Sequence, residues 1–505
     1  MSSNKTIAKN TMFLYFRMFL IMGITLFTSR IVLRELGVSD YGIYNLVGGF
    51  VAMLGFFNAA MSSATQRYLS FDIGKGDHVQ LKKTFSATLS IHIFIALIGL
   101  LLAETIGLWY VNNKLNFPED RMYAVNVVYQ FSVLTFLLSI IQVPYNALII
   151  ARERMKIYAY VSILEAILKL LIVFFLVYFG SDKLITYAIL TFCVALLIRI
   201  IYQVYCRREF EESKYHFHYD KQYFGELISY SGWNLFGNIA AVAKGQGVNI
   251  VLNLFFGTVV NAAYGITNQV FSAVNMFVSN FQLALNPQII KSYSQGNIEQ
   301  SQYLISQGSK FSFYLMLVIV SPIILNVDFI LEIWLVNPPE YTSVFVQLCL
   351  LNILIDGLSG TLMTGAQATG KIKWYQIVVG TLVFLNLPIS YLVLKLGYKP
   401  YSVYGVSIFI SLITLQFRLY FLNNVMSFNI IKYIKEVILR VIVLSIITLG
   451  LFMLLYNTQF MHKEIGDFIL KSLIMVVLTV SCVLIIGLDK QERKLIFNFI
   501  NKIRQ

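Results

Sequence analysis

Long apolar runs separated by short polar connections extend along nearly the whole chain. Each run holds about 20 residues, the length that an α-helix needs to cross about 30 Å of hydrocarbon. The pattern predicts about fourteen spans, near 8–33, 41–66, 84–110, 123–150, 157–179, 183–206, 226–253, 258–284, 306–326, 342–368, 374–396, 402–424, 435–456 and 465–487. We therefore expect an all-α integral membrane protein without a soluble domain. The run 226–253, rich in Gly and Asn, fits this pattern least well.

The basic residues between the predicted spans indicate how the chain is oriented. Twenty-five Lys and Arg residues fall on the side that holds both termini, and seven fall on the other side. The positive-inside rule places the more basic side, and hence both termini, in the cytoplasm. A wrong span count would mix the two sets, so the asymmetry also supports fourteen spans.

The composition agrees with a membrane protein and excludes several other classes. The 505 residues are 58% hydrophobic and 13% charged, against about 25% charged in an average soluble domain. The net charge of +14 lies in short clusters between apolar runs, which is typical of cytoplasmic loops and not of a nucleic-acid-binding surface. The four cysteines are far apart and show no disulfide or metal-ligand spacing. The start of the chain shows no cleavable signal peptide.

Short motifs recur about 220 residues apart. Val32–Gly37 resembles Val251–Gly257, and Gly76-Asp77 resembles Gly296-Asn297. This offset predicts two six-span lobes in the same orientation, related by an internal parallel repeat, which is a transporter architecture. The predicted domains are an N-lobe (1–215), a C-lobe (216–428) and two additional spans with a cytoplasmic tail (429–505). The alternative is that Gly, Tyr and Lys are common in the loops of any polytopic protein.

Ionisable residues inside the predicted spans are candidates for the functional site. Each costs at least about 2.5–3.5 kcal/mol at the bilayer centre, so it usually faces a cavity or a partner. Cations exceed acids in this set, so a cavity lined by them would attract an anionic substrate. The predicted substrate-binding cations are Arg17, Arg30 and Lys244. The predicted coupling or cavity residues are Asp356, Glu165, Lys169, Gln246 and Asn249.

Several of these candidates have a second, structural interpretation. Glu165 and Lys169 are four residues apart with the acid first, which favours an intrahelical ion pair. Arg30 lies near the outer end of its span, where it can bind lipid headgroups. The sequence Gly245-Gln246-Gly247 beside Lys244 predicts a bent or broken helix. The polar residues between Asn234 and Asn253 either line a cavity or form helix–helix hydrogen bonds.

The sequence contains no sign of catalysis or of a cofactor. It has no Gly-rich phosphate-binding loop followed by Lys and Ser/Thr, so we expect no ATP hydrolysis by the chain itself. The predicted external connections are short and carry no paired acids that would serve a glycosyltransferase. We therefore expect a transporter and not an enzyme, with no cofactor and no metal site.

Three segments at the ends of predicted spans resemble a known family. They are Leu36-Gly37-Val-Ser-Asp-Tyr-Gly-Ile-Tyr44, Gln66-Arg67-Tyr68, and Ala151-Arg-Glu-Arg154 with its equivalent Ala368-Thr-Gly-Lys371. In these segments, and over essentially its whole length, the chain is similar to the O-antigen (Wzx-type) polysaccharide flippases. These belong to the multidrug/oligosaccharidyl-lipid/polysaccharide (MOP) exporter superfamily, which has the MATE-like fold.

The resemblance implies a function. The substrate would be an undecaprenyl-diphosphate-linked oligosaccharide repeat unit, moved by alternating access from the cytoplasmic to the periplasmic leaflet of the bacterial inner membrane. Its partners would be this anionic lipid-linked glycan and membrane lipids, with no nucleic acid. The protein would act as a monomer, near a polysaccharide polymerase. The resemblance also implies arginines in the first span, which Arg17 and Arg30 match.

Two other functions stay open from the sequence. A multidrug/cation antiporter of the same superfamily would need an acidic site, for which only Asp356, Glu165 and Glu104 are available, and it usually has twelve spans and not fourteen. A membrane glycan polymerase would need a sizeable external loop, which the predicted topology lacks. The sequence does not identify the sugars or a coupling ion.

Overall fold

The structure is a computed structural model of the full chain. It describes residues 3–53, 56–113, 117–178, 182–216, 220–335, 337–456, 458, 460, 464–489 and 492–493. The α-helices are α1 (Ser3–Met53), α2 (Phe56–Lys75), α3 (His78–Leu102), α4 (Leu108–Asn113), α5 (Met122–Ala151), α6 (Met155–Tyr178), α7 (Lys183–Glu209), α8 (Lys221–Ser294), α9 (Ile298–Leu325), α10 (Val327–Leu335), α11 (Thr342–Thr369), α12 (Lys373–Lys395), α13 (Ser402–Met426), α14 (Ile430–Tyr433), α15 (Leu439–Tyr456) and α16 (Glu464–Cys482). Short π and 3-10 turns join some of them, and the described residues contain no strand.

Twelve helical segments of the described chain are long and apolar enough to cross a membrane. The predicted spans 41–66 and 258–284 are not among the twelve, although both lie in helices: the first in α1 beyond Gly37 and in α2, the second in α8 beyond Gly257. The segment 258–284 is rich in Asn, Gln, Ser and Thr, which lowers its mean hydropathy. The segment 41–66 includes residues 54–55, which lie outside the described residues. With them, the helices account for all fourteen predicted spans.

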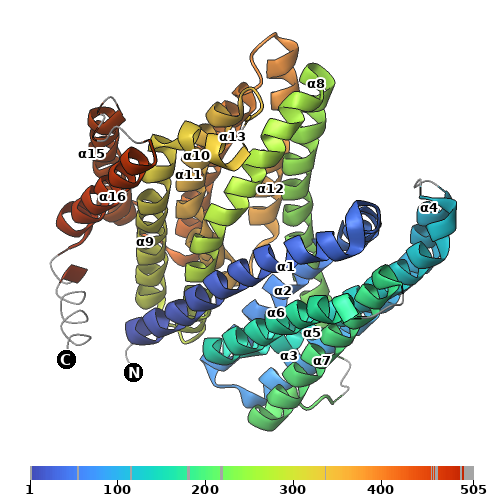
Figure 1. The fold of residues 1–505 in the computed structure, drawn as a ribbon. Coiled ribbons are helices and arrows are strands. Elements are labelled where there is room, and N and C mark those ends of the chain that lie inside the picture. The colour runs from blue at the N-terminus through green and yellow to red at the C-terminus, as the bar shows by residue number, and fades with distance from the viewer. Residues whose placement is uncertain are drawn as a thin grey trace, which may run out of the picture. The chain divides into compact units, whose positions relative to one another are not determined.

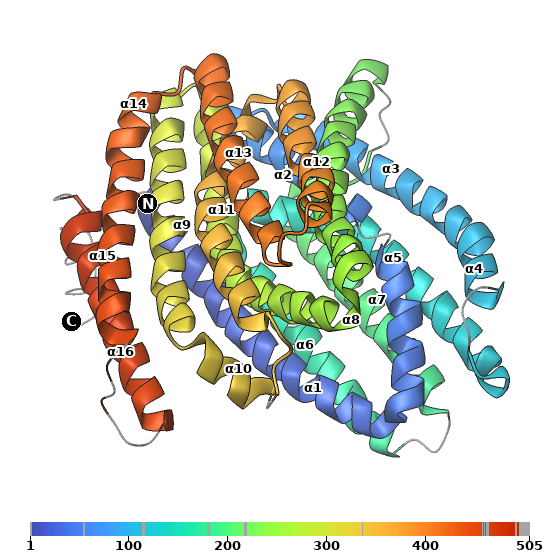
Figure 2. The same cartoon turned by 90° about the horizontal axis from the view of Figure 1, so that it is seen from above.

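The two longest helices each contain one sharp break. Both breaks fall at a glycine, with φ 75° and ψ 168° at Gly37 in α1 and φ 75° and ψ −164° at Gly257 in α8. Backbone angles of this kind are essentially confined to glycine, because any Cβ would clash. Figure 2 shows α1 as two arms that meet at a bend. The breaks lie 220 residues apart, at the offset that the sequence repeat predicts.

A second pair of glycines repeats at the same offset. Gly76 and Gly296, with φ 72° and 77°, end α2 and α8. In both turns the glycine N–H donates three residues back, to Ile73 and Tyr293, at 3.2 and 3.0 Å. The next residue donates five residues back, at 3.3 and 3.0 Å. This is the hydrogen-bond pattern that closes a helix with a left-handed glycine, so the repeat is present in the backbone as well as in the sequence.

The described chain divides into two compact units. The first comprises Met1–Asn238 with Ile290–Asn297, and the second comprises Ile239–Ile289 with Ile298–Gln505. In the first unit α5 is central and packs on α1, α2, α3 and α7, while α6 packs on α1 and α7. In the second unit α11 packs between α9 and α13, and α12 packs on α13. The two additional helices, α15 and α16, lie beside α9 (Figure 1).

The predicted break beside Lys244 is wrong. The helix is not broken at Gly245-Gln246-Gly247, because α8 continues to Gly257. Gly247 instead permits close packing, since a Cβ there would lie 2.7 Å from Cδ1 of Leu387 in α12.

Ion pairs of Arg121 link three segments of the first unit. Arg121, at the start of α5, donates to Asp40 just beyond the α1 break (3.1 and 2.5 Å) and to Asp182 at the start of α7 (2.6 and 3.2 Å). Asp182 also caps α7 by accepting the N–H groups of Leu184 and Ile185. Partial burial acts to raise the pKa of Asp182, but these hydrogen bonds outweigh it and lower the pKa.

Substitution of the break glycine tests its role. Gly257→Ala should destabilise the protein by about 1–3 kcal/mol, because alanine does not tolerate these angles. The measurement is thermal unfolding in detergent. Gly405→Ala in α13 is the matched control, because it has space for a Cβ and should be neutral or slightly stabilising. Equal melting temperatures for Gly257→Ala and wild type would contradict the break.

Arg121→Gln should lower the free energy of unfolding by about 1 kcal/mol at neutral pH, because it removes two ion pairs that are partly screened by solvent. A carboxylate with a lowered pKa stabilises the fold above its unfolded pKa and loses that contribution as the pH falls. The difference in melting temperature from wild type should therefore be constant from pH 8 to 5 and shrink below about pH 4. A difference that does not change with pH would show that Asp40 and Asp182 are not the partners that matter.

Candidate functional site

A polar cavity of about 440 Å³ lies within the first unit. Its walls are α1, α5, α6 and α7, which place polar side chains three or four residues apart on one helical face. From α6 come Tyr158, Ser162, Glu165 and Lys169. The other polar residues that line it are Arg17, Thr25, Thr28, Tyr41, Tyr44, Gln142, Asn146, Tyr187 and Tyr202.

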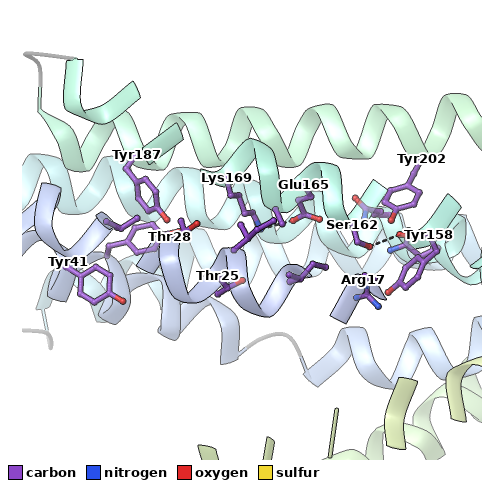
Figure 3. A pocket seen from close by; sticks show the side chains of 17 residues that line it. Arg17, Thr25, Thr28, Tyr41, Tyr158, Ser162, Glu165, Lys169, Tyr187 and Tyr202 are labelled. Atoms are coloured by element: carbon purple, nitrogen blue, oxygen red, sulfur yellow. Dashed lines mark hydrogen bonds and ion pairs between the residues drawn. The ribbon is translucent and has the colours of Figure 1, made fainter. Parts of the chain in front are cut away.

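The charged groups occupy one part of this cavity. Figure 3 shows Arg17, Tyr158, Ser162 and Tyr202 at one end, Tyr41 and Tyr187 toward the other, and Glu165 and Lys169 between them. Lys169 Nζ lies 2.7 Å from Glu165 Oε1, so this pair is neutral as a unit. Together, the three charged side chains give the cavity a formal charge of +1.

Arg17 is held by a tyrosine and not by an acid. Its guanidinium lies over the Tyr158 ring, 4.7 Å from the centroid. A cation–π contact of this kind fixes the position of a cation without neutralising it. The Nε of Arg17 is buried and has no hydrogen-bond partner among the described residues. Because a buried donor without a partner is costly, Arg17 is ready to donate to an anionic ligand.

The structure brings together three of the predicted site residues: Arg17, Glu165 and Lys169 all line this cavity. Arg30 lies in α1, but its side chain is outside the described residues. The ion-pair interpretation of Glu165 and Lys169 and the cavity interpretation both hold, because the pair forms on the cavity wall. Polar residues at the same helical spacing, such as Tyr158, Gln142 and Asn146, were missed because uncharged candidates were sought only in the polar stretch from Asn234 to Asn253.

The other predicted residues lie in the second unit and do not line this cavity. Lys244 and Asp356 both act electrostatically on the Cys349 thiol, and Asn352 donates to Asp356 at 2.8 Å. Gln246 is exposed on α8. A functional role for these residues stays a prediction.

Asn249 joins the two arms of α8. It accepts two hydrogen bonds from Nδ2 of Asn261 across the Gly257 break, at 2.8 Å to its main-chain oxygen and 2.6 Å to Oδ1. Asn249 therefore takes part in helix–helix hydrogen bonding, which is one of the two interpretations of this polar stretch.

Comparison with known proteins identifies the family. Residues 7–293, more than half of the chain, match the family model described as polysaccharide biosynthesis protein. This chain belongs to that family. Residues 236–392 also match the MatE model, and the chain is a multi-pass membrane transporter of the MOP superfamily. A search of curated proteins finds no match.

Solved structures with the same fold are MATE transporters. One is an outward-facing multidrug resistance MATE family transporter of the MOP superfamily, with a TM-score of 0.72 and 11% identity, covering 84% of this chain and 96% of its own. VcmN from Vibrio cholerae, in the bent form, has a TM-score of 0.70 and 16% identity, covering 84% and 97%. MATE in complex with MaD3S has a TM-score of 0.71 and 10% identity, covering 84% and 97%. At these identities the likeness establishes the MATE-like fold alone.

The charge of the cavity makes a prediction about anion binding. Glu165→Gln releases Lys169 and raises the formal charge from +1 to +2, so inorganic pyrophosphate should bind roughly three- to tenfold more tightly. Arg17→Gln should weaken the binding by a similar factor. The measurement is calorimetric titration of the purified protein at low ionic strength. Tighter binding after Arg17→Gln, or weaker binding after Glu165→Gln, would contradict the assigned charge.

Proposed function

We propose that this transporter is a flippase for an undecaprenyl-diphosphate-linked oligosaccharide repeat unit. It moves this lipid from the cytoplasmic to the periplasmic leaflet of the bacterial inner membrane by alternating access, during the synthesis of a surface polysaccharide such as O-antigen or capsule. Family membership supports a transporter in polysaccharide biosynthesis. The choice of an anionic substrate rests on the cavity.

The observation that carries this proposal is Arg17. A cation with a buried, unpartnered Nε in a cavity of net positive charge favours an anion. A diphosphate offers several oxygens that accept charge-assisted hydrogen bonds, which are about twice as strong as neutral ones. Lys169 is a second donor, because the incoming diphosphate can replace Glu165 as its partner. Lys244 is the predicted cation of the second unit.

The proposal also covers the membrane orientation, the partners and the oligomeric state of the protein. Both termini lie in the cytoplasm, following the distribution of basic residues. The partners are the lipid-linked anionic oligosaccharide and the surrounding lipids, with a polysaccharide polymerase nearby that consumes the flipped product. The transporter acts as a monomer.

A multidrug/cation antiporter is the second candidate. The observation in favour of the antiporter is Glu165, a carboxylate that lines the same cavity. The tyrosines around it suit an organic cation. In the structure this carboxylate already has a cation as its partner, Lys169 at 2.7 Å, whereas Arg17 forms no ion pair with a carboxylate of the described residues. A cation entering the cavity would have to displace Lys169 and tolerate Arg17, so we favour the anionic substrate.

Complementation distinguishes these functions. We expect the wild-type chain to restore polymer in a bacterium that lacks its own flippase for a known surface polysaccharide. Arg17→Gln should reduce polymer roughly 10- to 100-fold at equal membrane expression, because it removes a charge-assisted contact. Thr105→Val is the control, since Thr105 is exposed and donates only to the carbonyl of Leu101.

Further arms of the same experiment decide the outcome. Loss of polymer in Lys244→Ala would extend the site to the second unit, and retention would restrict it to the first. Full activity of Arg17→Gln would contradict the role of Arg17. Resistance to a cationic drug, lost in Glu165→Gln and without polymer in any arm, would replace the flippase with the antiporter.

A further inference from the structure

A second cavity of about 340 Å³ adjoins the charged one in the first unit. Tyr44 lines both cavities. The described residues that line the second cavity include no charged side chain: they are Tyr44, Gly48, Val51, Phe131, Ser132, Thr135, Phe136, Ser139, Ala188 and Thr191. Five of these ten residues carry a hydroxyl and three carry an aromatic ring. Its size is within the range of small-molecule sites.

One face of α5 connects the two cavities. Ser132, Thr135 and Ser139 line the second cavity, and Gln142 and Asn146 line the charged one. These five residues are spaced three, four, three and four apart, so they form a single polar stripe along the helix. The stripe is about 21 Å long, at 1.5 Å per residue. A helix in the middle of a membrane-spanning bundle has no structural need for such a stripe, because its backbone is already hydrogen-bonded.

The hydroxyl groups of the second cavity are oriented as acceptors. Thr135 donates its proton to the carbonyl of Phe131 at 2.8 Å, and Ser139 donates to the carbonyl of Phe136 at 2.7 Å. The Thr135 oxygen keeps lone pairs that can accept a hydrogen bond from a ligand. A ligand for this cavity therefore supplies hydroxyl or amide donors and an apolar face for the rings of Phe131 and Tyr44, and it carries no charge.

We propose that the second cavity is the subsite for the sugar next to the diphosphate, and that Thr135, Ser139 and Gly48 determine which sugar the protein accepts. A sugar ring has hydroxyl donors at its edge and C–H groups on its face. The assignment rests on the proposed function, because it sets the diphosphate beside Arg17 and Lys169 and directs the first sugar past Tyr44 along the α5 stripe. A prenyl chain has no donors and would leave five hydroxyls facing hydrocarbon.

Binding of paired probes to the purified full-length protein tests the subsite. The probes are farnesyl diphosphate and the same lipid carrying one sugar on the diphosphate: glucose, galactose or N-acetylglucosamine. We expect at least one sugar to increase the affinity roughly tenfold in the wild type. Thr135→Val with Ser139→Ala should remove most of this gain, since each lost acceptor is worth roughly fivefold. Farnesyl diphosphate itself should bind as before.

Two further variants separate a blocked subsite from a damaged fold. A Cβ at Gly48 meets no atom within 4 Å, so Gly48→Leu should fill the cavity without strain and abolish the gain from the sugar. Gly23→Leu is the matched control, because Gly23 also lies in α1 with nothing within 4 Å of its Cβ and lines neither cavity. Thr105→Val is the control for Thr135→Val, because both hydroxyls donate to the carbonyl four residues back.

The outcomes distinguish the subsite from the proposed function. The subsite is overturned if no sugar increases the wild-type affinity, if the gain survives in both cavity variants, or if the hydroxyl variants bind farnesyl diphosphate more tightly, which would assign the cavity to the prenyl chain. The proposed function fails if farnesyl diphosphate binds no better than farnesol, or if Arg17→Gln leaves its affinity unchanged.

Discussion

The cost of placing a charge in hydrocarbon organises this structure, because every ionisable side chain inside a span needs a partner or a cavity. Among the described residues most intramembrane charges have found a partner. Lys471 pairs with Asp467 at 2.8 Å on its own helix, Lys310 pairs with Glu492, and Arg199 lies over the Tyr145 ring at 4.3 Å. The partners neutralise or fix these charges, so they need no further role. Arg17 differs because a tyrosine ring holds it at the wall of a cavity and leaves its charge uncompensated.

The paired glycine breaks show how the fold makes room for polar helices. Beyond Gly257 the chain continues in a helix that is too polar to qualify as a membrane span by its composition alone. Beyond Gly37 the helix is more apolar but carries polar residues such as Tyr41 and Tyr44. A polar helix is stable in a bilayer only when its polar face is covered by other helices or lines a cavity. Asn249 and Asn261 show the first solution, since they satisfy each other across the Gly257 break. Tyr41 and Tyr44, just beyond Gly37, show the second, since they line the charged cavity.

The two cavities of the first unit differ in the interactions that they can offer to a ligand. The charged cavity provides strong, weakly directional attraction through Arg17 and Lys169, and the neutral cavity provides hydroxyl acceptors at fixed positions on α5. Charge attracts any phosphate, whereas matched hydrogen bonds discriminate between ligands of similar size. Under the function we propose, the charged cavity would bind the diphosphate common to such substrates, and the neutral cavity would select the sugar through hydrogen bonds. The MATE transporters share this fold, and a fold alone does not fix a function, which depends on the side chains of the site.

The sequence by itself determined the helical architecture, the approximate positions of the spans and the repeat. These follow from local physics, because each span must hydrogen-bond its own backbone in lipid and must therefore be a long, mostly apolar helix. It also indicated that Arg17, Glu165 and Lys169 matter, because charges within apolar runs are visible in one dimension. Tertiary structure alone decided that these three line one cavity while Lys244 and Asp356 lie in the other unit. It also decided that the helix continues through Gly245 and Gly247 to the break at Gly257, and that Ser132, Thr135 and Ser139 of α5 line a cavity. Packing between helices distant in sequence determines such facts, since a glycine or a serine has the same local propensity whether it faces a neighbour, lipid or a cavity.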